Sequence, residues 1–151
     1  MLFLLFQLGS DRYALDVSQI VEVLPMVRIR VMLRSPPGVA GTINYRGAHV
    51  PVIDMSELAL GRPTVPRLST RIILVNSCEQ GGKSRLLGLI AENATETMRK
   101  EPSDFAPSGI DNSDAPYLGP IAMGPHGMVQ RIELNGLLSA SMRCSLFKES
   151  A

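Results

Sequence analysis

The chain has 151 residues, 45% of them hydrophobic and 19% charged, a composition typical of one soluble globular domain with an apolar core. Its formal net charge is +1, with Lys and Arg scattered along the chain, and it contains no Trp, so a nucleic-acid-binding protein is disfavoured. No stretch approaches the roughly 20 apolar residues of a membrane-spanning helix. The apolar residues 1–6 lack the basic region of a signal peptide. We therefore expect a cytoplasmic protein that meets a membrane only through a partner.

Short runs rich in Val, Ile and Leu, separated by Gly, Pro, Asn or Ser, predict strands along most of the chain. The predicted strands cover residues 2–8, 20–24, 39–45, 50–53, 71–76, 86–91 and 128–134. Helical periodicity is sustained nowhere for more than two turns. Between residues 102 and 127, five Pro and four Gly predict a mobile region of loops with brief regular structure. The overall pattern is typical of an all-β barrel protein.

Two short helical turns are predicted by capping residues, whose side-chain oxygens accept from unpaired backbone N–H groups at a helix start. Asp16, with Gln19 three positions later, predicts the first turn, and Asp54 with Glu57 predicts the second. Gly61 then suits the left-handed residue that ends a helix.

The residues that usually carry chemistry form no recognisable catalytic or metal site. His49 and His126 are the only histidines, and neither lies at a recognised spacing from a Ser or Cys nucleophile. Cys78 and Cys144 lack the spacing of a zinc site or a disulfide framework, so we expect reduced thiols. Residues 81–84 match the end of a phosphate-binding loop without its first glycine. The sequence therefore predicts no enzyme activity, no cofactor and no metal.

The most specific pattern lies between residues 35 and 58, which predict a strand, a tight turn and a second strand. Gly47 permits the positive φ that such a turn needs, and Arg46 projects at the turn beside the strand end. Pro51 cannot donate to a strand ladder, which predicts an edge or irregular position. Asn44, Gly47 and Asp54 are therefore assigned structural roles in the turn and in the helix cap that follows.

The motif Asn-Tyr-Arg-Gly at 44–47, followed by Val-Pro-Val-Ile-Asp at 50–54, resembles the signature of the CheW family. The resemblance extends upstream through residues 3–9, 13–17 and 21–23. Downstream it includes residues 87–90, 117–118 and 134–138, so it covers nearly the whole chain.

This resemblance implies two small SH3-like, five-stranded β-barrels around a shared apolar core, with short helical turns. They would form a single domain over residues 1–146, with a tail at 147–151. It also implies a non-catalytic adaptor that couples the cytoplasmic tip of a methyl-accepting receptor to the regulatory domain of a CheA-type histidine kinase in receptor arrays. The loop at 102–116 has no clear counterpart in the family. This departure and the polar residues Gln130 and Arg131 in the last predicted strand together lead to the hypothesis of a non-flagellar signalling pathway.

By the same resemblance, the receptor-contact groove maps onto Val17, Ile20, Glu22, Gly41 and Arg46, with Gly88 beside it. For Val17 and Ile20, plain core packing is an equally open interpretation, and Gly41 could serve only close backbone approach. Glu22 alternates with Val21 and Val23 and is predicted to be exposed. Residues contacting the kinase are not assigned.

Gln130 and Arg131 interrupt a strand that is more continuously apolar in the family. Strict alternation would place Met128, Gln130, Ile132 and Leu134 on one face, with Arg131 facing solvent.

Three other functions are open. The first is a CheW-like scaffold or competitor that binds receptors without recruiting a kinase. The second is a small β-barrel enzyme, which needs a pocket with convergent polar groups that the sequence does not display. The third is a nucleic-acid-binding barrel, which the near-neutral charge disfavours.

Overall fold

The computed structural model describes residues 1–78, 84–109 and 113–138. Strands dominate this part of the chain, as the sequence predicts. They are β1 (Leu2–Leu8), β2 (Asp11–Asp16), β3 (Ile20–Pro25), β4 (Val39–Tyr45), β5 (Ala48–Asp54), β6 (Arg71–Cys78), β7 (Ser84–Arg99), β8 (Leu118–Gly124) and β9 (Gly127–Ile132). The helical elements are the 3-10 turn η1 (Val17–Gln19), the helix α1 (Met55–Leu60), and the 3-10 turns η2 (Pro102–Asp104) and η3 (Leu134–Gly136).

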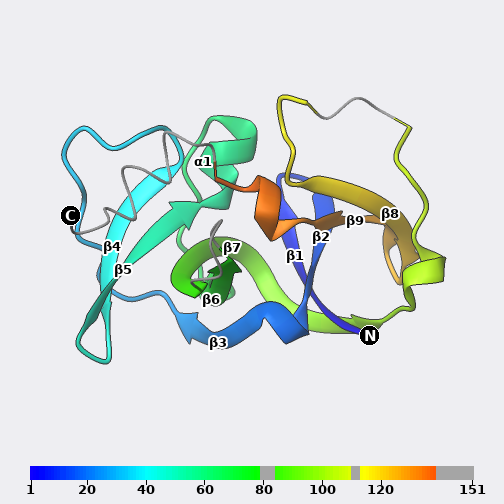
Figure 1. Ribbon diagram of the computed structural model, residues 1–151, viewed down its shortest axis with the longest axis horizontal. Coiled ribbons are helices and arrows are strands. Elements are labelled where there is room, and N and C mark those ends of the chain that lie inside the picture. The colour runs from blue at the N-terminus through cyan, green and yellow to red at the C-terminus, as the bar shows by residue number, and fades with distance from the viewer. Residues whose placement is uncertain (79–83, 110–112, 139–151) are drawn as a thin grey trace.

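The long strand β7 belongs to two barrels, which lie side by side in Figure 1. Its first half pairs with β6 and, in parallel, with the end of β5. Its second half pairs with β1. Asn93 has a positive φ of 50°, and the β1–β7 register shifts beside it, so β7 changes barrel at an irregularity of the kind that redirects a strand. Because β7 is shared, the nine strands of the described residues form two five-stranded halves.

We call these halves the β4–β5 barrel (β3, β4, β5, β6 and the first half of β7) and the β8–β9 barrel (β1, β2, β8, β9 and the second half of β7). Successive side chains of a strand point to opposite faces, so one strand can contribute to two apolar cores. In β1, Phe3 and Leu5 face the interior of the β8–β9 barrel, whereas Leu4 and Phe6 join a larger cluster that draws on both barrels. This larger cluster is the shared apolar core that the family resemblance implies.

All seven predicted strands are present, but two strands were missed, and five of the seven differ in their boundaries, most of all β7, which extends to Arg99. The strand β2 begins with charged residues, and β8 lies within the segment predicted to be mostly loop. Pro120 is accommodated in β8 because the β8–β9 register shifts between Leu118 and Ile121. The last predicted strand ends earlier than expected, since Leu134 begins η3.

Both predicted caps are confirmed. Asp16 accepts a hydrogen bond from the Ser18 backbone N–H at 2.9 Å. Asp54 accepts from the backbone N–H groups of Ser56 and Glu57, and Gly61 ends α1 with a left-handed φ of 74°. The boundary at residue 146, the tail at 147–151, Cys144 and the glycine pair at 81–82 all lie outside the described residues.

Arg131 does not face solvent, which corrects the prediction. Its side chain is only 20% exposed, and its guanidinium carbon lies 5.3 Å from the Phe3 ring centroid and 6.0 Å from that of Phe105. Its Nη2 atom lies 3.6 Å from Asp16 Oδ2. A cation above aromatic rings can occupy a largely apolar interior when its charge has a partner. The face of β9 opposite Arg131 is open at Met128, which is 68% exposed.

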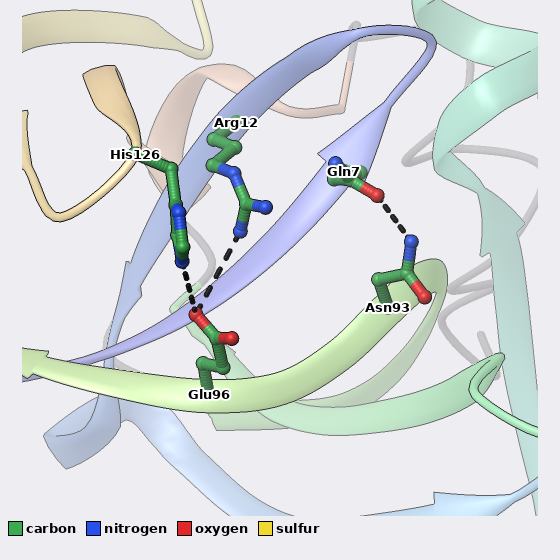
Figure 2. A network of polar contacts seen from close by, with 5 residues as sticks. All are labelled: Gln7, Arg12, Asn93, Glu96 and His126. Atoms are coloured by element: carbon green, nitrogen blue, oxygen red, sulfur yellow. Dashed lines mark hydrogen bonds and ion pairs between the residues drawn. The ribbon is translucent and has the colours of Figure 1, made fainter.

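A polar network on the outside of the β8–β9 barrel joins three of its elements (Figure 2). Glu96 of β7 lies 3.7 Å from Arg12 of β2 and 3.6 Å from the Nε2 atom of His126, which lies in the β8–β9 turn. Nearby, the Asn93 side chain donates a hydrogen bond to Gln7. Glu96 and His126 are about half exposed, so each ion pair contributes little to stability. The network gives His126 a structural partner.

Candidate functional site

The hairpin between β4 and β5 turns through Arg46 and Gly47. Their φ angles are 51° and 87°, the pair of positive values that a tight two-residue turn between strands requires. The Asn44 side-chain oxygen accepts from the Gly47 backbone N–H at 2.9 Å and holds the turn. The local sequence thus fixes an exposed cation, Arg46, at the hairpin tip, with its guanidinium carbon 5.2 Å from the Tyr45 ring centroid.

Tyr45 connects Glu22 with Arg46. The Tyr45 hydroxyl donates a hydrogen bond to the Glu22 carboxylate. This bond raises the pKa of Tyr45 above its ordinary value of 10.0, because ionisation would remove the donated proton and place a second negative charge beside Glu22. The structure therefore brings together two of the predicted receptor-contact residues, Glu22 and Arg46, around one phenol ring.

Glu22 is half-buried, so the prediction that it is exposed is wrong. Along β3 the exposed positions are those of Val21, Val23 and Pro25, and the two valines are 44% and 40% exposed. Side chains along β3 alternate between two faces as predicted, but Glu22 is on the inner face and the valines are on the outer face. Glu22 can lie there because its carboxylate accepts a hydrogen bond from the Tyr45 hydroxyl. Val27 continues the exposed apolar positions beyond the strand. Val21, Val23 and Val27 thus form an exposed apolar strip. None of the three is among the predicted receptor-contact residues, although their alternate spacing is visible in the sequence.

Val17 begins the short turn η1, and Ile20 follows its last residue. Both are half-buried and pack against the shared apolar core. The Asp16 cap fixes the start of this turn, and Asp16 also lies beside Arg131. Val17 and Ile20 therefore both contribute to the core, and part of each side chain remains accessible.

Gly41 and Gly88 are buried and do not reach the surface beside Glu22 and Arg46. A Cβ atom on Gly41 would lie 2.0 Å from the Arg30 carbonyl oxygen, because the segment before β4 pairs closely with that strand. A Cβ atom on Gly88 would lie 3.1 Å from a methyl carbon of Ile72. Both glycines permit close packing within the β4–β5 barrel.

Asp54 connects α1 with the segment that follows it. Besides capping α1 at 3.1 Å and 3.2 Å, its carboxylate accepts from the Thr64 backbone N–H at 2.9 Å and from the Thr64 hydroxyl. Asp54 is 5% exposed, so these bonds compensate for the burial of its charge.

The described residues contain no group of three or more His, Cys, Asp or Glu arranged to hold a metal ion. None of their helices has both the length and the apolar character to cross a membrane.

Two β-barrels that share one strand and bury a common apolar core define a double-barrel β protein. The model of the CheW-like domain family matches residues 2–142, and the chain belongs to this family. The predictions of family and fold are thereby confirmed.

Three relatives illustrate the match. The chain is similar to the chemotaxis protein CheW of Klebsiella aerogenes, with 22% identity over 106 residues, which cover 70% of this chain and 61% of that protein. The chemotaxis protein CheW of Rhizobium meliloti is 26% identical over 109 residues, covering 72% and 67%. The chain thus spans less than two thirds of the Klebsiella protein. Among solved structures, the scaffolding protein TtCheW from Thermoanaerobacter tengcongensis matches with a TM-score of 0.80 and 25% identity, covering 93% of this chain and 89% of that one.

Proposed function

We propose that this chain is a non-catalytic adaptor that couples methyl-accepting chemoreceptors to a CheA-type histidine kinase in a bacterial chemosensory array. Its membership of the CheW-like family and the names of its relatives, chemotaxis and scaffolding proteins, support this role. The observation that carries the proposal is the cluster of Glu22, Tyr45 and Arg46, because two of its members, Glu22 and Arg46, are residues that the family resemblance assigns to receptor contact. The adaptor would be cytoplasmic and would reach the membrane through the receptor.

The proposed receptor site combines apolar and charged contacts. The accessible parts of Val17 and Ile20 would receive the apolar stripe of a receptor helix. Arg46 would pair with a receptor carboxylate or a helix carbonyl and set the register. Glu22 would hold the hairpin in position through Tyr45, while Gly41 and Gly88 would shape the barrel behind the site.

A pull-down of the tagged protein from its own cells, with bound partners identified by mass spectrometry, tests this proposal. Wild type should recover a methyl-accepting receptor and a CheA-type kinase. Arg46→Glu should lose the receptor, whereas Arg67→Glu, an exposed charge reversal outside the site, should retain it. Recovery of neither partner by wild type would contradict the adaptor function. Retention of the receptor by Arg46→Glu would contradict the site alone.

The same pull-down distinguishes an adaptor from a competitor, and a flagellar from a non-flagellar pathway. A competitor that occupies receptors without recruiting kinase would recover the receptor but no kinase. We also propose that the pathway is non-flagellar, because the loop at 102–116 departs from the family pattern. A partner list containing only flagellar chemotaxis proteins would refute that assignment.

A further inference from the structure

The positive charge of the chain is concentrated in one segment, although the chain as a whole is nearly neutral. Residues 23–53 contain four Arg and no Asp, Glu or Lys. The remainder of the chain contains eleven of the fifteen Lys and Arg but all fourteen Asp and Glu. A local basic field therefore accompanies the segment that forms β4 and β5.

The fold gathers part of this charge around an open groove of about 470 Å³. Its lining residues are Arg28, Arg30, Thr42, Ile43, Asn44 and His49. Arg30 and Thr42 exchange two backbone hydrogen bonds, of 2.8 Å and 2.9 Å, so the arginine segment lies along one side of β4. On the other side, Asn44 is the register partner of His49 of β5. The side chains of Arg28, Arg30, Asn44 and His49 thus lie around Thr42 and Ile43 of β4, on a lining that is mostly apolar.

No carboxylate lines this groove. Among the described residues, neither Arg28 nor Arg30 forms an ion pair with an acidic side chain, and both are exposed. Both side chains line the same groove, where their like charges repel each other. Fold stability does not explain their placement together, whereas the binding of an anion does.

An apolar surface extends the groove. A neighbouring hollow of about 430 Å³ shares Arg30, Thr42 and His49 and adds Val31, Met32 and Leu33. Val31 is 74% exposed and Leu33 is 92% exposed, so neither contributes much to a core. Exposed apolar side chains beside charges are typical of protein-binding surfaces.

We propose that this groove binds an acidic, extended segment of a protein partner, with carboxylates against Arg28 and Arg30 and apolar side chains against Val31 and Leu33. None of the proposed receptor-contact residues lines the groove, so this site is additional to the proposed function. A nucleic acid is disfavoured, because no Phe, Tyr or Trp side chain lines the groove for base stacking. A lipid surface is disfavoured, because these cations line a hollow instead of a protruding face.

Binding of a fluorescein-labelled short peptide of alternating Glu and Val to the full chain, measured by fluorescence anisotropy, tests the electrostatic part. We expect saturable binding that weakens with added salt, and no binding of the same peptide with Gln in place of Glu. The double variant Arg28→Glu/Arg30→Glu should weaken binding at least about tenfold. The control Arg67→Glu/Arg99→Glu makes the same charge change at exposed positions outside the groove. Circular dichroism should show that both variants are folded.

The pair Leu33→Ser and Leu68→Ser tests the apolar part. Both leucines are more than 90% exposed, so neither substitution should disturb the fold. Leu33→Ser should weaken peptide binding several-fold, and Leu68→Ser should leave it unchanged.

Three outcomes would overturn the proposal. They are no saturable binding of the acidic peptide, an equal loss of binding in the two arginine double variants, and an equal effect of the two leucine substitutions. Phosphatidylglycerol vesicles and single-stranded DNA serve as competing polyanions. Tighter binding of either, with the same dependence on Arg28 and Arg30, would assign the groove to that class and exclude a protein segment.

Discussion

The Tyr45 hydroxyl donates a hydrogen bond to the Glu22 carboxylate across the two edge strands of the β4–β5 barrel. The strand order places β3 at one edge and β4 at the other, so this bond helps to close the barrel. It also couples β3 with the hairpin that carries Arg46. The proposed receptor site is therefore held by one phenol that contacts both of its charged groups.

Titration of Tyr45 reports this bond directly. Its pKa is raised chiefly by the hydrogen bond to Glu22, so in wild type it should ionise at higher pH than an ordinary tyrosine. Glu22→Gln should lower the pKa towards the ordinary value, because the negative charge is removed. The absence of Trp leaves three tyrosines to dominate the near-ultraviolet absorbance. Tyr45→Phe identifies the transition by removing it, and an identical titration curve in Glu22→Gln would contradict the assigned bond.

The sequence predicts caps and turns well because they depend on neighbouring residues. Asp16, Asp54 and Gly61 occupy the predicted positions, since each satisfies or ends a backbone hydrogen-bonding pattern only a few residues away. The turn at Arg46 and Gly47 is predicted for the same reason, because its conformation depends on neighbouring residues.

The exposure of Glu22 could not be predicted from local sequence. Alternation along β3 shows that Val21 and Val23 share a face, but not which face is inside. Glu22 can lie on the inner face because Tyr45, which is 23 positions away in the sequence, donates a hydrogen bond to its carboxylate. Arg131 is similar, because it is accommodated inside a barrel by aromatic rings from remote segments.

Asp54→Ala should destabilise the fold strongly. The substitution removes the cap of α1 and leaves the buried Thr64 backbone N–H without its acceptor, at a total cost of roughly 2–4 kcal/mol. Urea unfolding followed by circular dichroism measures this difference. Asp104→Ala removes an exposed cap of η2 and should cost less than about 1 kcal/mol. Equal losses in the two variants would show that the Asp54 bonds are not made.

Gly41→Ala should lower the free energy of unfolding far more than Gly47→Ala. At Gly41, where φ is 148°, the new methyl group meets the Arg30 carbonyl, which we expect to cost more than about 3 kcal/mol. At Gly47 a methyl group meets nothing within 4 Å, so only the left-handed backbone opposes it, at about 1–2 kcal/mol. Thermal unfolding compares the two variants. A fully stable Gly41→Ala that fails to bind receptor would instead make Gly41 a contact residue.

Arg131→Ala should cost about 2–3 kcal/mol, because it removes a cation that packs over Phe3 and leaves Asp16 without its charge partner. Arg12→Ala removes a more exposed ion pair to Glu96 and should cost less than about 1 kcal/mol. Denaturant midpoints at low and high salt measure both effects. If Arg131→Ala were as stable as wild type, Arg131 would face solvent as the sequence alone suggests.

The most direct test of the coupling role is autophosphorylation of the CheA-type kinase in a mixture reconstituted from one organism. The mixture would contain receptor-bearing membranes, the kinase and this chain. We expect kinase activity to rise with the concentration of wild-type chain, to fall at least about tenfold with Arg46→Glu, and to be unchanged by Arg67→Glu. Kinase activity that does not depend on the chain at any concentration would contradict the proposed function.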